Sequence, residues 1–275
     1  DFIKKNAHID SISRSSKRKN AHQIKEFAIK GSKIVNQHPN YPNQLLCEIE
    51  TYRGCSRSIV GGCLFCSEPQ KGAPDFRPIS DIVLEVKALY DHQIRHIRLG
   101  NQPCIFSYMA KDASTQEFPT PNANAIYELF SNIRKNAPDL QTFHIDNANP
   151  GVIARHPEES MQVAKHIISF HTSGDVAAFG VESVDPKVIE ENNLKANEEQ
   201  VLSAIQILNQ IGAEKGKSGL PELLPGLNFL FGLPGERKKT YELNFDFLKR
   251  IIKEDLLLRR INIRQVIPIP YTPID

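Results

Sequence analysis

Six strand-like segments alternate with helical segments along most of the chain. The strand-like runs lie at 45–52, 95–100, 140–146, 176–182, 226–232 and 260–267. Helical patterns lie between them at 80–93, 123–136, 157–170, 197–211 and 239–255, and a shorter one follows Asp185. We expect Ser80 to cap the helix at 80–93 and Asn197 to cap the helix at 197–211. Parallel neighbours need a long crossover, usually a helix, so this order predicts an α/β fold with a parallel sheet. The sheet is either doubly wound or curled into a barrel.

One face of these runs is strongly polar. Side chains alternate between the two faces of a strand, so apolar residues such as Ile97 and Leu99 share one face. The opposite face carries Glu48, Glu50, His96, Arg98, His144, Asp146, Glu182, Asn228, Asn262 and Arg264. A doubly wound sheet buries both faces, and a closed eight-stranded barrel has an apolar interior. The pattern therefore predicts a partial, open (β/α)6 TIM-like barrel with a hydrated interior. Solvated faces of edge strands are the alternative.

Charge is distributed unevenly along the 275 residues. Residues 1–35 contain nine Lys and Arg against three Asp and Glu, although the whole chain carries only +2. We expect residues 1–44 to form a basic N-terminal extension whose helix, over 21–35, docks on a barrel domain at 45–275. The extension could contact nucleic-acid phosphates, and a solvated leader is the alternative. No apolar run is long enough to cross a membrane, so we expect no membrane partner. The five cysteines, clustered and odd in number, are typical of a reducing compartment, which predicts a cytoplasmic protein.

Three of the five cysteines lie in one short stretch. Cys55, Cys63 and Cys66 have the spacing Cys-x7-Cys-x2-Cys and follow the first strand-like run. Three thiolates form an incomplete metal site, because four are needed to close a zinc site or to ligate every iron of a cubane. Cys47 falls on an apolar face and is expected in the core. Cys104 opens the long segment 103–122, which we expect to be a functional lid or a disordered insert, and it is either an ordinary loop cysteine or an auxiliary thiol.

With these residues the chain resembles the radical S-adenosylmethionine (SAM) superfamily, whose usual triplet is Cys-x3-Cys-x2-Cys. Phe65 occupies the aromatic position before the last cysteine. Further matching segments follow the later strands: Leu99–Gln102, Phe179–Ser183, Phe231–Glu236 and Val266–Pro273. The triplet region also resembles an archaeal subgroup with a helix-hairpin-helix region after the barrel. That region is absent from these residues, so we expect a domain truncated at its C-terminus.

The resemblance implies a [4Fe–4S] cluster on Cys55, Cys63 and Cys66, with SAM bound to the remaining iron. One electron, from a donor such as a ferredoxin or flavodoxin, would release a 5′-deoxyadenosyl radical that acts on an unidentified polar substrate. The residues expected to bind the cofactors are Phe65, Gly100, Asn101, Gln102, Asp146, Glu182, Ser183 and Asn228. The substrate candidates are Glu48, Glu50, His96, Arg98, His144 and Arg264. The alternative for these six is a set of internal salt bridges, such as Glu50 with Arg98 or Arg264.

Two other functions stay open at this point. One is a tRNA-modifying or other RNA-modifying methylthiotransferase-like enzyme whose accessory domain lies outside these residues. The other is a non-catalytic binding protein stabilised by zinc, which would need one His or Cys in addition to the triplet.

Overall fold

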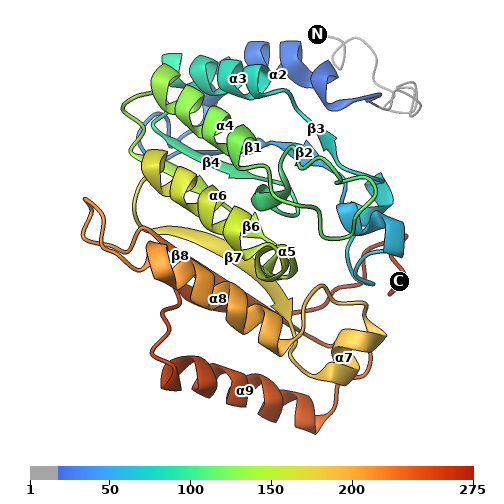
Figure 1. Ribbon diagram of the computed structural model, residues 1–275. Helices are drawn as coiled ribbons and strands as arrows, with labels where there is room; N and C mark the ends of the chain where they lie inside the picture. The colour runs from blue at the N-terminus through green and yellow to red at the C-terminus, as the bar shows by residue number, and fades with distance from the viewer. Residues whose placement is uncertain (1–17) are drawn as a thin grey trace.

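The computed structural model describes residues 18–275 and shows an α/β fold (Figure 1). Its strands are β1 (Leu46–Glu50), β2 (Tyr52–Arg53), β3 (Asp75–Phe76), β4 (His96–Gly100), β5 (Thr142–Ile145), β6 (Asn147–Ala148), β7 (Asp175–Glu182), β8 (Leu223–Phe231) and β9 (Arg260–Gln265). Its α-helices are α2 (Lys25–Gly31), α3 (Ile79–Asp91), α4 (Ala123–Asn136), α5 (Pro150–Arg155), α6 (Pro157–Phe170), α7 (Pro186–Glu191), α8 (Glu198–Gly212) and α9 (Lys238–Lys253). None of the helices in these residues is long and apolar enough to span a bilayer.

The parallel strands follow one another in chain order. One set is β1-β4-β5 and the other is β6-β7-β8-β9, and Asp146 is the single residue between β5 and β6. The two sets therefore join into one succession of six strand positions. Within residues 18–275, β1 and β9 are not paired, so the barrel is partial and open as predicted. The short β2 and β3 pair antiparallel beside it.

The helices cover the apolar face of the strands. Helices α3, α4, α6 and α8 pack side by side in chain order, and α2 contacts α3 (Figure 1). The strand residues below them, including Ile97, Leu99, Phe143 and Ile145, are fully buried. The expectation of an apolar outer face therefore holds for these strands. It is wrong for β9, where Ile261 and Ile263 are 44% and 70% exposed, because no described helix covers that face.

Helix boundaries follow local capping. Asn197 caps α8 as predicted, since its side chain accepts the Gln200 amide and the Gln200 side chain accepts the Asn197 amide. Ser80, the expected cap of the second helix, is instead inside α3: the cap position is Pro78, because the helix already begins at Ile79. The sequence patterns missed β6 and α5, which are too short for a periodicity to develop.

The first half of the segment 103–122 is neither a lid nor a disordered insert. Cys104, Ile105, Phe106 and Tyr108 are all at most 3% exposed and belong to the main hydrophobic core. The Tyr52 hydroxyl donates to the carbonyl oxygen of Cys104 at 2.6 Å. This contact and the apolar side chains hold the first half of the segment inside the fold. Cys104 is accordingly a buried core cysteine.

Candidate active site

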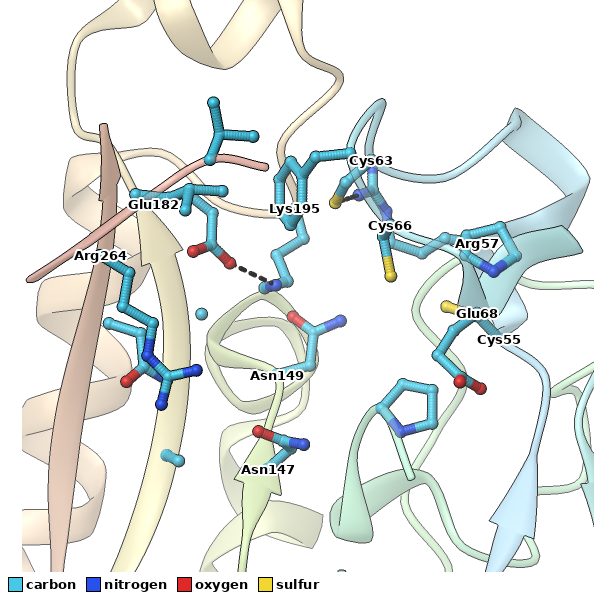
Figure 2. A pocket seen from close by; sticks show the side chains of 18 of the residues that line it. Cys55, Arg57, Cys63, Cys66, Glu68, Asn147, Asn149, Glu182, Lys195 and Arg264 are labelled. Carbon is cyan, nitrogen blue, oxygen red and sulfur yellow. Dashed lines mark hydrogen bonds and ion pairs between the residues drawn. The ribbon is translucent and has the colours of Figure 1, made fainter. Parts of the chain in front are cut away.

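A cavity of about 570 Å³ lies at the carboxyl ends of the strands (Figure 2). Its walls come from the residues after β4, from β6, from the ends of β7 and β8, and from β9 with the segment that follows it. All three triplet cysteines line it. Figure 2 shows the cysteines on one side and Arg264 on the other, with Lys195 and Asn149 between them. This is the end of a parallel sheet where α/β active sites lie.

The cysteine loop has a defined local structure. Cys55 follows β2, and the residues after it form a short 3-10 helix, Ser56–Val60. Gly61 and Gly62 then turn the chain with φ values of 82° and 72°, a region that favours glycine. A Cβ on Gly62 would overlap the Pro69 ring, whereas a Cβ on Gly61 would meet nothing within 4 Å. Gly62 thus allows the loop to fold tightly enough to bring Cys63 beside Cys55.

The donor set fits an iron–sulfur cluster. Burial raises the pKa of the Cys55 thiol to about 11, and the neighbouring sulfurs of Cys66 and Cys63 also raise it. Burial likewise raises the pKa of the Cys66 thiol. Thiols that are hard to ionise alone become stable thiolates when a cationic metal group binds them and displaces their protons. Among residues 18–275, no group of three or more His, Cys, Asp or Glu side chains is arranged to hold a single metal ion.

Arg57 lies directly against the triplet, and sequence reasoning missed it. Its Nη1 donates to the Cys63 sulfur at 2.9 Å and its Nε donates to Glu117 Oε1 at 2.8 Å. Its Nη2 donates to Asn193 Oδ1 at 3.1 Å. The residue is 3% exposed. The available signal was its place as the one basic residue between Cys55 and Cys63.

A second cation, Lys195, lies between the triplet and β7. Its Nζ is 3.2 Å from Glu182 Oε1, and Glu182 is 8% exposed. Burial lowers the pKa of Lys195, but Glu182 and the sulfurs of Cys63 and Cys66 outweigh burial and leave that pKa raised. A Cβ at Gly180 would overlap both Glu182 and Lys195, so the pair needs glycine there. No sequence pattern pointed to Lys195, since it follows a short helix in an irregular segment.

The structure gathers most of the expected cofactor-binding residues. Phe65, Asn101, Gln102, Glu182 and Asn228 line the cavity. Two Asn side chains that sequence reasoning missed, Asn147 and Asn149, also line it.

Three expected cofactor-binding residues do not line the cavity. Gly100 packs against the Glu48 side chain, and the hydroxyl of Ser183 donates to Asn244 Oδ1 at 3.3 Å. Burial raises the pKa of the Asp146 carboxyl, the positive charge of Arg98 lowers it, and the negative charge of Glu48 raises it further.

Of the six substrate candidates, Arg264 alone lines the cavity. Glu48 binds Arg98 instead, and the Arg98 Nε lies 3.1 Å from Glu48 Oε2. The expected pairing of Glu50 with Arg98 or Arg264 is wrong: Glu50 binds Arg18 at 2.6 Å and lies 3.7 Å from Arg53. The strand register explains this difference, because it places Glu48 opposite Arg98 and Glu50 opposite Gly100.

The two histidine candidates bind polar neighbours within the fold. His96 Nδ1 lies 2.8 Å from Thr142 Oγ1. His144 Nδ1 lies 4.0 Å from Asp175 Oδ1, and neither histidine lines the cavity. Their contacts match the alternative of internal polar pairs.

The sequence model of the radical SAM superfamily matches residues 49–248, which is more than half of the chain. The chain belongs to this superfamily. The match spans the strands β2 to β8 and the whole cysteine loop, so all cavity-lining residues up to Leu230 lie within it, whereas β9 and the segment after it lie beyond the match.

Several archaeal proteins are similar in sequence to this radical SAM domain. An uncharacterised protein of Methanocaldococcus jannaschii, MJ0274, is 54% identical over 247 residues, which are 90% of this chain and 45% of that protein. An uncharacterised protein of Archaeoglobus fulgidus is 46% identical over 92% of this chain and 46% of its own length. The chain thus spans less than half the length of these relatives. A more distant relative, "Putative methylthiotransferase MJ0865", is 24% identical over 73% of this chain and 38% of its own length.

Two solved structures have a similar fold. The radical SAM methyltransferase TsrM from Kitasatospora setae aligns over 83% of this chain and 37% of its own, with a TM-score of 0.54 and 16% identity. Coproporphyrinogen III oxidase (HemN) from Escherichia coli, a radical SAM enzyme, aligns over 89% of this chain and 48% of its own, with the same TM-score and identity. At this identity the likeness establishes the fold.

Proposed function

We propose that this protein is a radical SAM enzyme in which Cys55, Cys63 and Cys66 hold a [4Fe–4S] cluster beside SAM. The observation that carries the proposal is the convergence of the three cysteines and the Lys195–Glu182 pair on one cavity at the carboxyl end of the sheet. When bound, the cluster and SAM supply one-electron chemistry, fed by a donor such as a ferredoxin or flavodoxin, that yields a 5′-deoxyadenosyl radical.

The chain's own residues would position SAM. Lys195 Nζ presents a positive charge suited to a carboxylate, and Glu182 presents a carboxylate suited to an ammonium group or to ribose hydroxyls. The side-chain amides of Asn147, Asn149 and Asn228 add donors and acceptors along the same floor. Apolar side chains of Phe65, Leu230, Val266 and Ile267 complete the lining. They would exclude water from a reactive intermediate.

The substrate would enter on the side of Arg264. This guanidinium lines the cavity opposite the cysteines, and the structure gives it no hydrogen-bond or ion-pair partner among residues 18–275. A polar, anionic group on the substrate would pair with it.

The test is anaerobic reconstitution with iron and sulfide, followed by electron paramagnetic resonance and an assay for 5′-deoxyadenosine formed from SAM. We expect a reduced cubane signal and 5′-deoxyadenosine in the wild type, and loss of both in C55A, C63A and C66A. C47A is the matched control, because Cys47 is partly buried against the core and does not line the cavity. A cubane signal that survives in all three triplet variants would overturn the cluster assignment.

A second candidate function is modification of RNA by a methylthiotransferase-like reaction. The observation that favours it is the 24% identity to the relative whose name carries that activity. Full-length protein would be incubated with SAM and bulk tRNA, and nucleosides would be analysed by mass spectrometry. A mass gain of one methylthio group supports this reaction, and unmodified tRNA alongside formation of 5′-deoxyadenosine excludes it.

A further inference from the structure

The wide gap between the first two cysteines has a structural consequence. The residues between Cys55 and Cys63 form the 3-10 helix Ser56–Val60 and the Gly61–Gly62 turn. The helix holds Arg57 at its second position, where the side chain turns back under the loop to the Cys63 sulfur. The dashed contact between Arg57 and Cys63 in Figure 2 marks this hydrogen bond. The loop between the first two cysteines therefore places its own guanidinium group against the sulfur of Cys63.

Arg57 is fixed on three sides. Its three donor nitrogens each bind a different partner: Glu117 Oε1 at 2.8 Å, the Cys63 sulfur at 2.9 Å and Asn193 Oδ1 at 3.1 Å. Asn193 in turn donates to the carbonyl oxygens of Val60 and Gly62 at 3.0 and 2.8 Å. A planar guanidinium held in this way keeps one N–H aimed at the sulfur without losing further side-chain entropy.

A hydrogen bond to a cysteine sulfur changes the energetics of the cluster that the sulfur ligates. The bond withdraws negative charge from the thiolate, and this stabilises the reduced cluster more than the oxidised one, because the reduced cluster carries the additional electron. Hydrogen bonds to the sulfurs are among the factors that set the reduction potentials of such clusters. The bond here lies in a buried setting, where electrostatic effects are less screened than at the surface.

Resting on the proposed function, we infer that Arg57 is a positioning residue that raises the reduction potential of the cluster through its hydrogen bond to Cys63. Reduction adds one electron from the external donor and makes or breaks no bond to Arg57. The residue thereby makes the cluster easier to reduce.

The experiment is a redox titration of reconstituted wild-type protein and R57M, without SAM, followed by electron paramagnetic resonance. We expect the equilibrium constant for one-electron reduction to fall about tenfold in R57M, which is about 59 mV downward. R155M is the matched control: Arg155 lies over the Phe118 ring, 3.7 Å from its centroid, close to Arg57, yet it donates to the Gly151 carbonyl and not to a cysteine. It should keep the wild-type potential.

Two further measurements cover the case in which R57M fails to retain iron. R57K keeps the positive charge but loses the planar guanidinium that donates to three partners, so its reduction potential should lie below that of wild type. E117Q leaves Arg57 in place and should not lower the reduction potential. In protein labelled with ¹⁵N-arginine, the reduced cluster should show a nitrogen coupling in wild type and R155M. A wild-type potential in R57K, or the absence of a nitrogen coupling in the wild type, would overturn the inference. Absence of a cubane in the wild type would instead overturn the proposed function.

Discussion

Two arginines line opposite walls of the same cavity and differ in almost every physical respect. Arg57, in the cysteine wall (Cys55–Cys66), is 3% exposed and donates to three partners. Arg264, in the open wall (Asn228–Leu230 and Arg264–Ile269), is exposed and has no recorded partner within residues 18–275. The cysteine wall is therefore preorganised, as a site that holds a rigid inorganic group requires. The open wall keeps its polar groups available for a ligand.

The open wall is tied to the cysteine wall by the end of the described chain. The Ile274 amide donates to the carbonyl oxygen of Leu64 at 3.3 Å, and Ile267 and Ile269 line the cavity. This segment crosses the gap between β9 and the cysteine loop (Figure 1). The two walls thus differ in how their side chains are paired, and both belong to one cavity.

The largest effect should come from crowding the cysteine wall. In G62A the new methyl group would overlap the Pro69 ring, and the alanine would have to adopt a positive φ. We therefore expect the free energy of unfolding to fall by roughly 2–4 kcal/mol and iron to be poorly retained. G61A has the same backbone cost without the overlap and should lose about 1 kcal/mol. Urea unfolding and iron content of the two variants measure the difference. Equal losses would show that the wall tolerates crowding and is not preorganised.

Breaking the Lys195–Glu182 pair should have the next largest effect. Glu182 is only 8% exposed, and K195M removes the cation that pairs with its carboxylate. We expect a loss of about 2–3 kcal/mol, less than for a fully buried pair, together with weaker binding of SAM. Urea unfolding and calorimetric titration with SAM provide the two readouts. The double variant K195M/E182Q should recover part of the stability but not the binding, and full stability in K195M alone would contradict the pairing.

A pH effect should reveal how Asp185, the N-cap of α7, ties that helix to the start of α9 behind the cavity-lining strands. Asp185 accepts from Thr240 Oγ1 at 2.6 Å and from Arg237 Nη2 at 3.2 Å at the start of α9. Burial raises the pKa of Asp185, but the bonds from Arg237, Thr240 and the Lys187 amide outweigh burial and leave it lowered.

The unfolded chain therefore binds a proton at higher pH than the folded chain. The stability from Asp185 is present above the unfolded pKa of about 3.9 and is lost as the pH falls through the lower folded value. Unfolding measured between about pH 5 and pH 2.5 should show this loss, and D185N should flatten it by about 1 kcal/mol. R237M should also reduce the pH dependence of stability, but by less than D185N does. A D185N profile parallel to wild type would contradict this role.

The smallest effect on stability should come from the open wall itself. R264M removes an exposed side chain with no recorded partner in the described chain, so the free energy of unfolding should change by less than about 0.5 kcal/mol. R57M, by contrast, leaves Glu117 and Asn193 without their donor and should lose about 2 kcal/mol. Denaturation of the two variants tests the comparison directly, and similar losses would abolish the distinction between the walls.

The strands and helices were predictable because their signals are local. Alternation along β4 and the N-cap at Asn197 can be read from neighbouring residues, and the structure confirms both. In β7, by contrast, residues on both faces are buried. The segment 103–122 was not predictable, because its aromatic residues have no periodicity. Their burial depends on partners such as Tyr52 and Arg77, which lie far away in the sequence.

The sequence by itself determined the family and the three cysteines, since a spacing pattern is a property of the linear chain. Tertiary structure alone decided which charged side chains meet. It paired Glu48 with Arg98 through strand register, and it brought Arg57 to Cys63 through Glu117 and Asn193, which lie 60 and 136 residues from Arg57. Electrostatic and hydrogen-bond energies depend on distances in space, and these arise only when strands distant in the chain close around one cavity.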